Sequence, residues 1–253
     1  MKLQTKVLGW YKRNKRDLPW RRTTNPYHIL VSEVMLQQTQ VDRVIPYYKR
    51  WLKEFPTLAA LARAPTRKVL AIWSGLGYNN RALRLQKLAQ QTSKLPQTEE
   101  ELRQLPGIGP YTARAILAFA FNRDVAVVDT NIRRVLIHEL GLPEDISEAG
   151  LEAVALAQIP RGNSCEWHNA LMDYGALHAT SRKTGIKPLS TQPRFAGSTR
   201  WVRGQIVRAL VKEKSIPLPE LEQAFPHTRF SEVVAKLRQE GLVRQVGSRL
   251  QLG

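Results

Sequence analysis

The 253-residue sequence contains a single cysteine, Cys165, and no apolar run long enough to cross a membrane. One cysteine excludes an intramolecular disulfide, and no cluster of cysteines and histidines indicates a structural zinc site. The missing stretch of about 20 apolar residues argues against a membrane-spanning helix. The first residues also lack the apolar segment and cleavage site of a signal peptide. We therefore expect a cytoplasmic protein with no membrane partner.

Acidic residues are scarce relative to basic ones. The sequence has 39 lysines and arginines against 21 aspartates and glutamates, which gives a formal net charge of +18. Such an excess indicates a polyanionic partner, and nucleic acid is the leading candidate. An anionic membrane surface is the second candidate. Binding to it would need one markedly basic amphipathic helix, whereas here the basic residues are spread along the chain.

The long N-terminal part of the chain shows helical periodicity and no alternating strand pattern, so it predicts an all-α class. The first helix is amphipathic, with Leu3, Val7 and Trp10 on one side. Thr98 and Glu101 form a capping box at the start of a later helix. Further helices are expected at about 40–55, 57–64, 66–73, 79–92, 130–139, 147–159 and 164–179.

The C-terminal part has a different pattern. Residues 181–199 are rich in Ser, Thr, Pro and Gly, which indicates a linker. Helical patterns follow at 201–214, 218–225 and 228–240, and then an alternating pattern predicts two strands that turn at Gly247 and Ser248. Three helices and a hairpin suggest a winged helix, which could bind DNA or another protein. The predicted organisation is a main domain (1–180), a linker (181–199) and a winged-helix-like domain (200–253).

The segment from Leu105 to Leu117, LPGIGPYTARAIL, combines a glycine-rich turn with the start of a helix. Gly107 and Gly109 allow the backbone to approach a ligand closely. The N–H groups at the start of the following helix would point at an anion such as a DNA phosphate. An ordinary helix-loop-helix corner would give the same pattern.

Two carboxylates stand out. Glu33 lies within an apolar helical run, where it is either a solvated carboxylate on the outer face or a group facing a cleft. In a cleft its pKa would be raised by desolvation, as a general acid requires. Asp129 precedes the helix predicted at 130–139, where an aspartate is a favoured N-cap.

Six motifs together resemble the helix-hairpin-helix DNA glycosylases, and most closely the adenine glycosylases of the MutY type. They are LPWR (18–21), SEVMLQQTQV (32–41), GLGY (75–78), LPGIGPYTA (105–113), VDTN (128–131) and MDYGA (172–176). The resemblance covers about residues 3–180. It implies a two-lobed helical fold and a base excision repair enzyme that removes adenine mispaired with 8-oxoguanine or guanine. The implied partner is double-stranded DNA with a mismatched or damaged base pair, bound by a nucleoid-associated monomer.

The resemblance also implies roles for the catalytic residues. Glu33 would protonate an adenine rotated out of the duplex, and Asp129 would stabilise the oxocarbenium-like sugar that remains. Asn131 would position Asp129 and a water molecule. Tyr111 occupies the position where bifunctional relatives carry a lysine that forms a Schiff base, and a phenol cannot do that chemistry. We therefore expect a monofunctional enzyme that leaves an abasic site.

The family pattern further implies two groups of binding residues. The adenine pocket would be formed by Arg16, Leu18, Trp20, Arg21 and Asp173. The DNA-binding residues would be Gln37, Gln38, Tyr78, Leu105, Gly107, Gly109, Tyr111 and Thr112. Of these, Gln38 and Tyr78 would fill or wedge the opened duplex. Asn79 and Asn80 depart from the family pattern beside this wedge.

Two larger departures concern the cofactor and the C-terminal domain. Relatives usually carry four cysteines that bind an iron–sulfur cluster, but the aligned positions here are Ala179, Ile186, Leu189 and Phe195. None can ligate iron, so we expect a member with no cluster and no other metal or cofactor. The domain by which relatives recognise 8-oxoguanine is also missing, and the predicted winged helix stands in its place.

Two other functions fit the same sequence. A mismatch thymine or uracil glycosylase is compatible with Tyr111, although the MLQQTQ block favours adenine. A non-catalytic DNA-binding or damage-sensing protein could join a decayed glycosylase to a winged helix. The retention of Glu33, Asp129 and Asn131 argues against such a decayed enzyme.

Overall fold

The computed structural model describes residues 2–189 and 195–253, so residues 190–194 of the predicted linker lie outside the described residues. The described chain forms two compact units. The first comprises residues 2–33, 95–104 and 108–189, and the second comprises residues 34–94, 105–107 and 195–253. Both units are discontinuous, because the chain passes from one to the other within a helix and again within the glycine hairpin.

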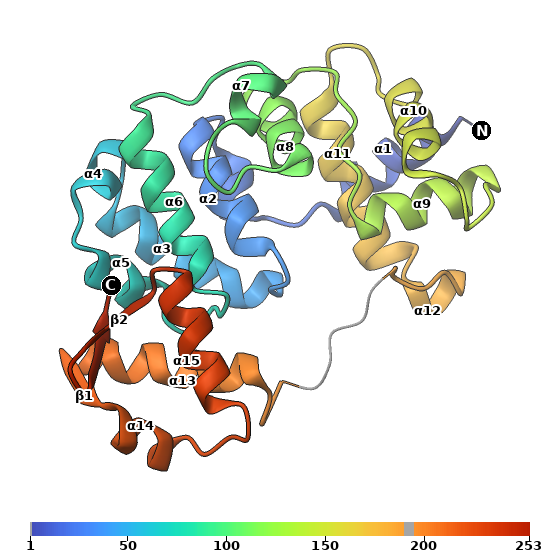
Figure 1. The fold of residues 1–253 in the computed structure, drawn as a ribbon. Coiled ribbons are helices and arrows are strands. Elements are labelled where there is room, and N and C mark those ends of the chain that lie inside the picture. Colours follow the sequence, from blue (N-terminus) through green and yellow to red (C-terminus); the bar gives the residue numbers. More distant parts are fainter. Residues whose placement is uncertain (1, 190–194) are drawn as a thin grey trace. The chain divides into compact units, whose positions relative to one another are not determined.

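Helices build the whole first unit (Figure 1). They are α1 (Leu3–Asn14), the 3₁₀-helix η1 (Pro19–Arg22), α2 (Pro26–Leu36), α7 (Glu99–Arg103), α8 (Pro110–Phe121), α9 (Thr130–Leu140), α10 (Glu148–Ala157), α11 (Ser164–Asp173), the π-helix η2 (Tyr174–His178) and α12 (Ser181–Thr184). The last residues of α2 belong to the second unit. Within the two described stretches of the chain, no helix is long and apolar enough to cross a membrane.

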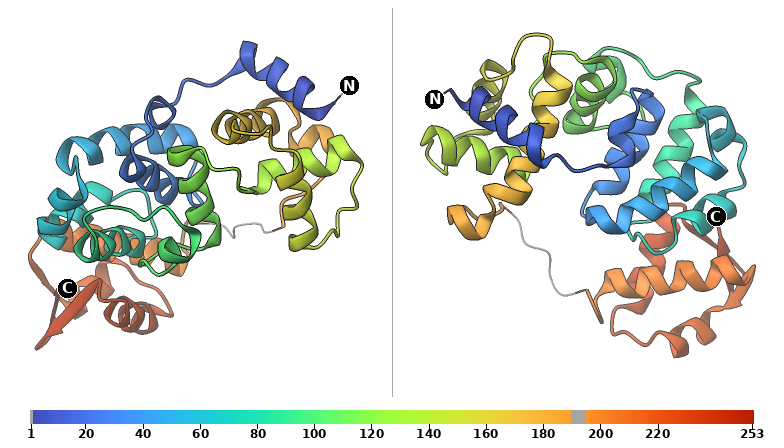
Figure 2. Two further views of the ribbon diagram at one scale, coloured as in Figure 1. Left: turned by 90° about the horizontal axis from the view of Figure 1, so that it is seen from above. Right: turned by 180° about the vertical axis from the view of Figure 1, so that it is seen from behind.

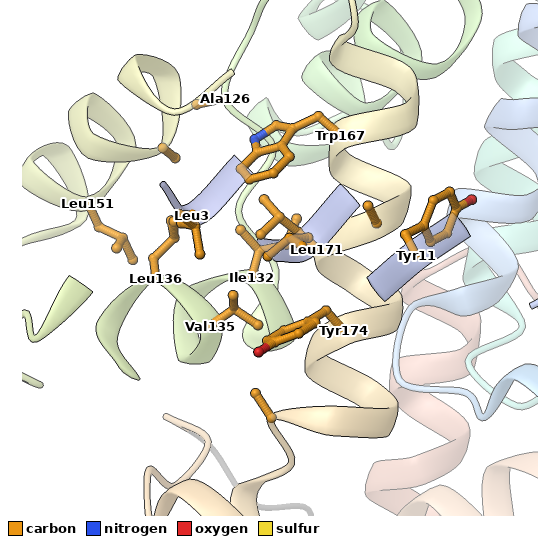
Figure 3. Packing of buried hydrophobic residues seen from close by; sticks show 14 residues of the cluster. Leu3, Tyr11, Ala126, Ile132, Val135, Leu136, Leu151, Trp167, Leu171 and Tyr174 are labelled. Carbon is orange, nitrogen blue, oxygen red and sulfur yellow. The ribbon is translucent and has the colours of Figure 1, made fainter. Parts of the chain in front are cut away.

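The core of the first unit forms around α11, which contacts α1, α8 and α9. Trp167 and Leu171 of α11 meet apolar side chains of α1, α9 and α10 (Figure 3). The first helix is amphipathic as predicted, but its buried stripe contains Tyr11 instead of Trp10. The reason is spacing, because Leu3, Val7 and Tyr11 are four residues apart and share one face. Trp10 lies at the edge of this stripe and packs edge-on against Tyr174, with 5.3 Å between ring centroids.

The predicted single helix at 164–179 is wrong in its last turn. The α-helix ends at Asp173 and continues as a π-helical turn from Tyr174 to His178. Gly175 packs directly on α9, since a Cβ atom there would lie 2.8 Å from Cβ of Asn131. The glycine therefore permits a close approach of the two helices, and the wider turn is part of that contact.

The second unit contains a helical part and a small C-terminal sheet. Its further elements are α3 (Val41–Glu54), α4 (Leu58–Arg63), α5 (Thr66–Trp73), α6 (Asn80–Gln91), α13 (Thr199–Lys212), β1 (Ser215–Pro217), α14 (Leu218–Ala224), α15 (Phe230–Gln239), β2 (Val243–Val246) and β3 (Arg249–Leu252). The antiparallel sheet has the order β1-β3-β2 and packs beside α13 and α15 (Figure 2).

The C-terminal elements agree with the predicted winged helix. Strands β2 and β3 form the predicted hairpin and turn between Val246 and Arg249. Strand β1 was not predicted, because three residues are too few to show an alternating pattern. Arg67 of α5 joins these elements to the helical part, since its guanidinium donates to the carbonyls of Val211 (2.7 Å) and Lys212 (3.0 Å) at the end of α13.

Replacing Arg67 should loosen the C-terminal elements. The Arg67→Ala variant leaves two carbonyls at the end of α13 without their charged donor, so we expect a loss of about 1 kcal/mol in the free energy of unfolding. Urea denaturation measures this loss, and limited proteolysis should cleave the variant faster after Lys212. Arg63→Ala, at an exposed position on the neighbouring helix α4, is the matched control, and an equal effect of both variants would contradict the assignment.

Candidate active site

Glu33 is buried inside the first unit, with only 7 % of its surface exposed. It lies on α2 among buried apolar residues such as Leu30 and Val31, so the alternative of a solvated carboxylate on the outer face is wrong. Burial, aided by the negative charge of Asp129, raises the pKa of Glu33 to about 7. A hydrogen bond from the Tyr111 hydroxyl opposes this shift. Near neutral pH the carboxyl therefore holds its proton in a large share of molecules.

Asp129 lies half-buried in the same unit and is the N-cap of α9, as predicted. Its Oδ1 accepts a hydrogen bond from the backbone N–H of Ile132 at 2.7 Å, and its Oδ2 accepts one from Nδ2 of Asn131 at 3.0 Å. Burial raises the pKa of Asp129, while these hydrogen bonds and the charge of Arg134 oppose the shift. Burial is thus the largest cause at both carboxyl groups, but only Asp129 receives both a backbone N–H and a side-chain amide that favour its ionised form.

Arg134 orients Asn131 and was missed from the sequence. Its Nη2 donates to Oδ1 of Asn131 at 2.7 Å, so the amide NH₂ of Asn131 must face Asp129. The same guanidinium donates to the carbonyls of Gly175 (2.6 Å) and Ala179 (2.7 Å). The only sequence signal was a basic residue three positions after Asn131, and such a pair is common on exposed helix faces.

His168 fixes the segment that leads into Asp129, and it too was missed. Its Nε2 accepts from the backbone N–H of Val127 at 3.1 Å, and its Nδ1 lies 2.8 Å from the carbonyl oxygen of Ser164. These partners require a neutral ring with the proton on Nδ1. Burial lowers the pKa of His168 and so favours that neutral form.

The residues predicted to form the adenine pocket are brought together around Asp173. Its carboxylate is fully buried and accepts hydrogen bonds from the backbone N–H and Nε of Arg16 and from both terminal nitrogens of Arg21, at 2.6–2.9 Å. Burial would raise the pKa of Asp173, but these hydrogen bonds hold it below its usual value. Leu18 and Trp20, which lie in sequence between Arg16 and Arg21, are buried. The ion pairs at Asp173 tie the segment before α2 to α11, and direct contact with a base stays a prediction.

The glycine hairpin has the backbone that its sequence predicts. Gly107 has a φ of +83°, and a Cβ atom there would lie 3.0 Å from Cβ of Arg84. Gly109 is the N-cap of α8 and has open space where a side chain would begin. Leu105 is half-buried, whereas the side chain of Thr112 is buried, so Thr112 could meet DNA only through its backbone. Anion binding by this hairpin stays a prediction.

In the second unit, the two residues predicted to wedge the opened duplex, Gln38 and Tyr78, both have a left-handed backbone. Gln38 has a φ of 56° and Tyr78 a φ of 48°, and both side chains are exposed. The loops that carry them are called the wedge loops below. Strain of this kind costs about 1–3 kcal/mol per residue and persists where other contacts impose it. Asn79, one of the two departures from the family pattern, is buried, and Asn80 begins α6.

Arg81 provides the contacts that hold the strained backbones of the two wedge loops. This role could not be predicted from the sequence. Its Nη1 donates to the carbonyls of Val34 (2.6 Å) and Gln37 (2.7 Å), and its Nη2 donates to that of Gly77 (3.2 Å). The guanidinium carbon also lies 5.5 Å from the ring centroid of Tyr78. Burial lowers the pKa of Arg81 to about 10, so it stays charged at neutral pH. One buried cation therefore holds both wedge loops.

The four positions aligned with iron ligands do not fit an iron–sulfur cluster. Ala179 and Ile186 are buried, and Leu189 and Phe195 are exposed. None of these hydrocarbon side chains supplies a thiolate or imidazole. Among residues 2–189 and 195–253, no group of three or more His, Cys, Asp or Glu residues is placed to hold a metal ion.

Comparisons with known proteins identify the family. The family model described as HhH-GPD superfamily base excision DNA repair protein matches residues 31–160. The adenine DNA glycosylase of Mycolicibacterium smegmatis is 39% identical over 230 residues, which cover 81% of this chain and 78% of the relative. The human adenine DNA glycosylase is 36% identical over 88% of this chain and 43% of its own length.

Solved structures give a similar result. A thermostable thymine-DNA glycosylase matches with a TM-score of 0.67 and 28% identity, over 71% of this chain and 87% of that one. A non-covalent endonuclease III–DNA complex matches with a TM-score of 0.63 and 22% identity, over 74% of this chain and 86% of that one. The second match supports the fold alone.

The raised pKa of Glu33 predicts a pH-dependent penalty on stability. Between about pH 4.5 and pH 7 the unfolded chain releases this proton while the folded protein keeps it, so stability falls as pH rises. Glu33→Gln lacks this titration. As pH rises from 4.5 to 8, the free energy of unfolding of the variant should increase by up to about 3 kcal/mol relative to that of the wild type. Urea denaturation at a series of pH values measures this difference. A difference that does not change with pH would contradict the raised pKa.

Proposed function

Because the chain belongs to the HhH-GPD superfamily of base excision DNA repair proteins, we propose that it is a DNA glycosylase that hydrolyses the N-glycosidic bond of adenine. The carrying observation is a pair of carboxyl groups in different environments. Burial raises the pKa of Glu33 to about 7, whereas Asp129 is half-buried and accepts hydrogen bonds from the N–H of Ile132 and the amide of Asn131. Glycoside hydrolysis needs such a pair. Relatives named adenine DNA glycosylases support the choice of base, and the net charge of +18 supports DNA as the partner.

In the first step Glu33 donates its proton to a ring nitrogen of the flipped adenine. Protonation makes the base a better leaving group, and the electron pair of the glycosidic bond departs with it. The hydrogen bond from Tyr111 keeps the Glu33 carboxyl in one orientation for this transfer. The sugar is left as an oxocarbenium-like cation.

In the second step Asp129 stabilises that cation by its negative charge. Water then adds to the sugar carbon and gives up a proton to the carboxylate of Glu33, which restores the acid and leaves an abasic site. Asn131, oriented by Arg134, holds Oδ2 of Asp129 in place at 3.0 Å. Asp129 serves at the same time as the N-cap of α9, so the helix itself fixes the position of the charge.

The reaction ends at the abasic site, because the phenol of Tyr111 cannot form a Schiff base with the sugar. We also propose that the enzyme works without an iron–sulfur cluster. Polar contacts support the region where relatives bind it, since Arg134 donates to the carbonyl of Ala179 and the Ser181 hydroxyl donates to that of Ile186. The substrate would be adenine opposite 8-oxoguanine or guanine in duplex DNA.

A second candidate is removal of thymine or uracil from a mismatch with guanine. It is favoured by the match to a thymine-DNA glycosylase at 28% identity. The two candidates differ in substrate and share the carboxylate pair, so one panel of duplexes separates them.

Single-turnover base release from duplexes with A opposite 8-oxoguanine, G or C, and with T or U opposite G, tests the proposal. We expect release of adenine opposite 8-oxoguanine and G, revealed by alkaline cleavage. Glu33→Gln should lower the rate by about 10²–10⁴-fold through loss of the general acid. Asp129→Asn should abolish release but leave folding intact, because asparagine is an equally good N-cap. The exposed Asp145→Asn is the matched control. Release of T or U alone would favour the second candidate, and release of no base would refute both.

The pH dependence of adenine release provides an independent test. Only the protonated form of Glu33 can act as an acid, so the single-turnover rate should fall about tenfold per pH unit above pH 7. The Glu33→Gln variant should have lost this descending limb. A wild-type rate that stays constant between pH 6 and pH 9 would show that Glu33 is not the acid.

A further inference from the structure

Arg200, at the start of α13, lies close to two aromatic rings of the second unit. Nη1 of Arg200 donates to the Tyr78 hydroxyl at 2.7 Å. The guanidinium carbon of Arg200 lies 5.9 Å from the ring centroid of Tyr78 and 6.0 Å from that of Phe195. Tyr78 and Phe195 are among the exposed large hydrophobic residues, at 39 % and 56 % of their surface. These three side chains are called the Arg200 cluster below.

The Arg200 cluster is held from several sides. Ser198 caps α13, because its hydroxyl accepts from the N–H of Trp201 and donates to the carbonyl of Phe195 at 2.7 Å. Arg67 holds the other end of α13. Arg81 fixes the loop that carries Tyr78 through the carbonyl of Gly77. The cluster is therefore supported by both the helical part and the C-terminal elements of the unit.

The chemistry of the Arg200 cluster suits an unstacked purine. Exposed aromatic rings stack on any base, which gives affinity without sequence preference. A guanidinium adds preference, since it donates to the O6 and N7 acceptors of guanine. Adenine carries an amino donor in place of O6, and so would not accept from arginine at that position. 8-Oxoguanine keeps the O6 acceptor.

We propose that the Arg200 cluster recognises the base left opposite the extruded nucleotide, and that Arg200 selects a guanine-type base through its O6 atom. The proposal rests on the proposed function, because an estranged base exists only where its partner has been rotated out of the duplex. The C-terminal elements thereby contribute to specificity through Arg200, and the segment before α13 contributes through Phe195.

Binding to duplexes that contain a tetrahydrofuran abasic-site analogue tests this assignment. The analogue is placed opposite guanine, hypoxanthine or 2-aminopurine, and Kd is measured by fluorescence anisotropy with the full chain. Guanine and hypoxanthine carry O6, whereas 2-aminopurine lacks it. We expect wild type to bind the first two about tenfold more tightly than the third. Arg200→Ala and Arg200→Lys should reduce this ratio to about twofold or less, because lysine restores the charge without the planar donor pair.

Two further variants separate recognition from general electrostatics. Arg208→Ala removes the same charge from an exposed position of the same helix and should weaken all three duplexes alike. Phe195→Ala should also weaken all three, by about tenfold, through lost stacking. Retention of the full preference by Arg200→Ala, or equal affinity of wild type for all three duplexes, would overturn the proposal. Because the tetrahydrofuran analogue carries no base, these duplexes have no base at the position where the enzyme would cleave. The measured affinities are therefore independent of glycosylase activity, which the base-release panel tests separately.

Discussion

Desolvation of one carboxyl group is the constraint on which the site depends. Glu33 lies on an apolar helix where water cannot stabilise its anion, so the neutral acid is favoured up to about pH 7. Its neighbour Asp129 is half-buried and receives an N-cap hydrogen bond and a hydrogen bond from a side-chain amide. The two chemically similar groups thus differ in their exposure and in the donors that stabilise their anions. That difference is what an acid-assisted cleavage with a stabilised cation requires.

Arginines fix the backbone in each unit by donating to carbonyls, at the catalytic pair in the first unit and at the predicted wedge residues in the second. Arg134 ties α9 to the π-helical turn, and Arg81 ties the end of α2 to the loop before α6. In each case a single guanidinium satisfies several carbonyls that are not adjacent in sequence. Such a tether is costly to remove, because the buried acceptors would lose a charged donor together. The excess of basic residues in this chain therefore serves internal structure as well as attraction to a polyanion.

Much of the helical fold could be predicted from the sequence, because its signals are local. Proline and glycine breaks, the caps at Thr57, Thr98 and Ser147, and the hairpin glycine with a positive φ all act within a few residues. The carboxylate pair was predicted through motif resemblance, and the structure adds the burial that raises the pKa of Glu33 and the donors that hold Asp129. By contrast, His168 and Arg134 act on partners about 40 residues away, and β1 exists only through its pairing with β3. No local pattern encodes such contacts.

The central claim is that Glu33 is a carboxylic acid at neutral pH, and its carboxyl carbon can be observed directly. We would label the glutamate side-chain carboxyls with ¹³C, record NMR spectra from pH 4 to pH 9, and assign the Glu33 signal by its absence from Glu33→Gln. The account predicts that this signal titrates near pH 7, well above the value of about 4.3 for a glutamate in an unstructured peptide. A Glu33 signal that titrates near 4.3 would contradict it.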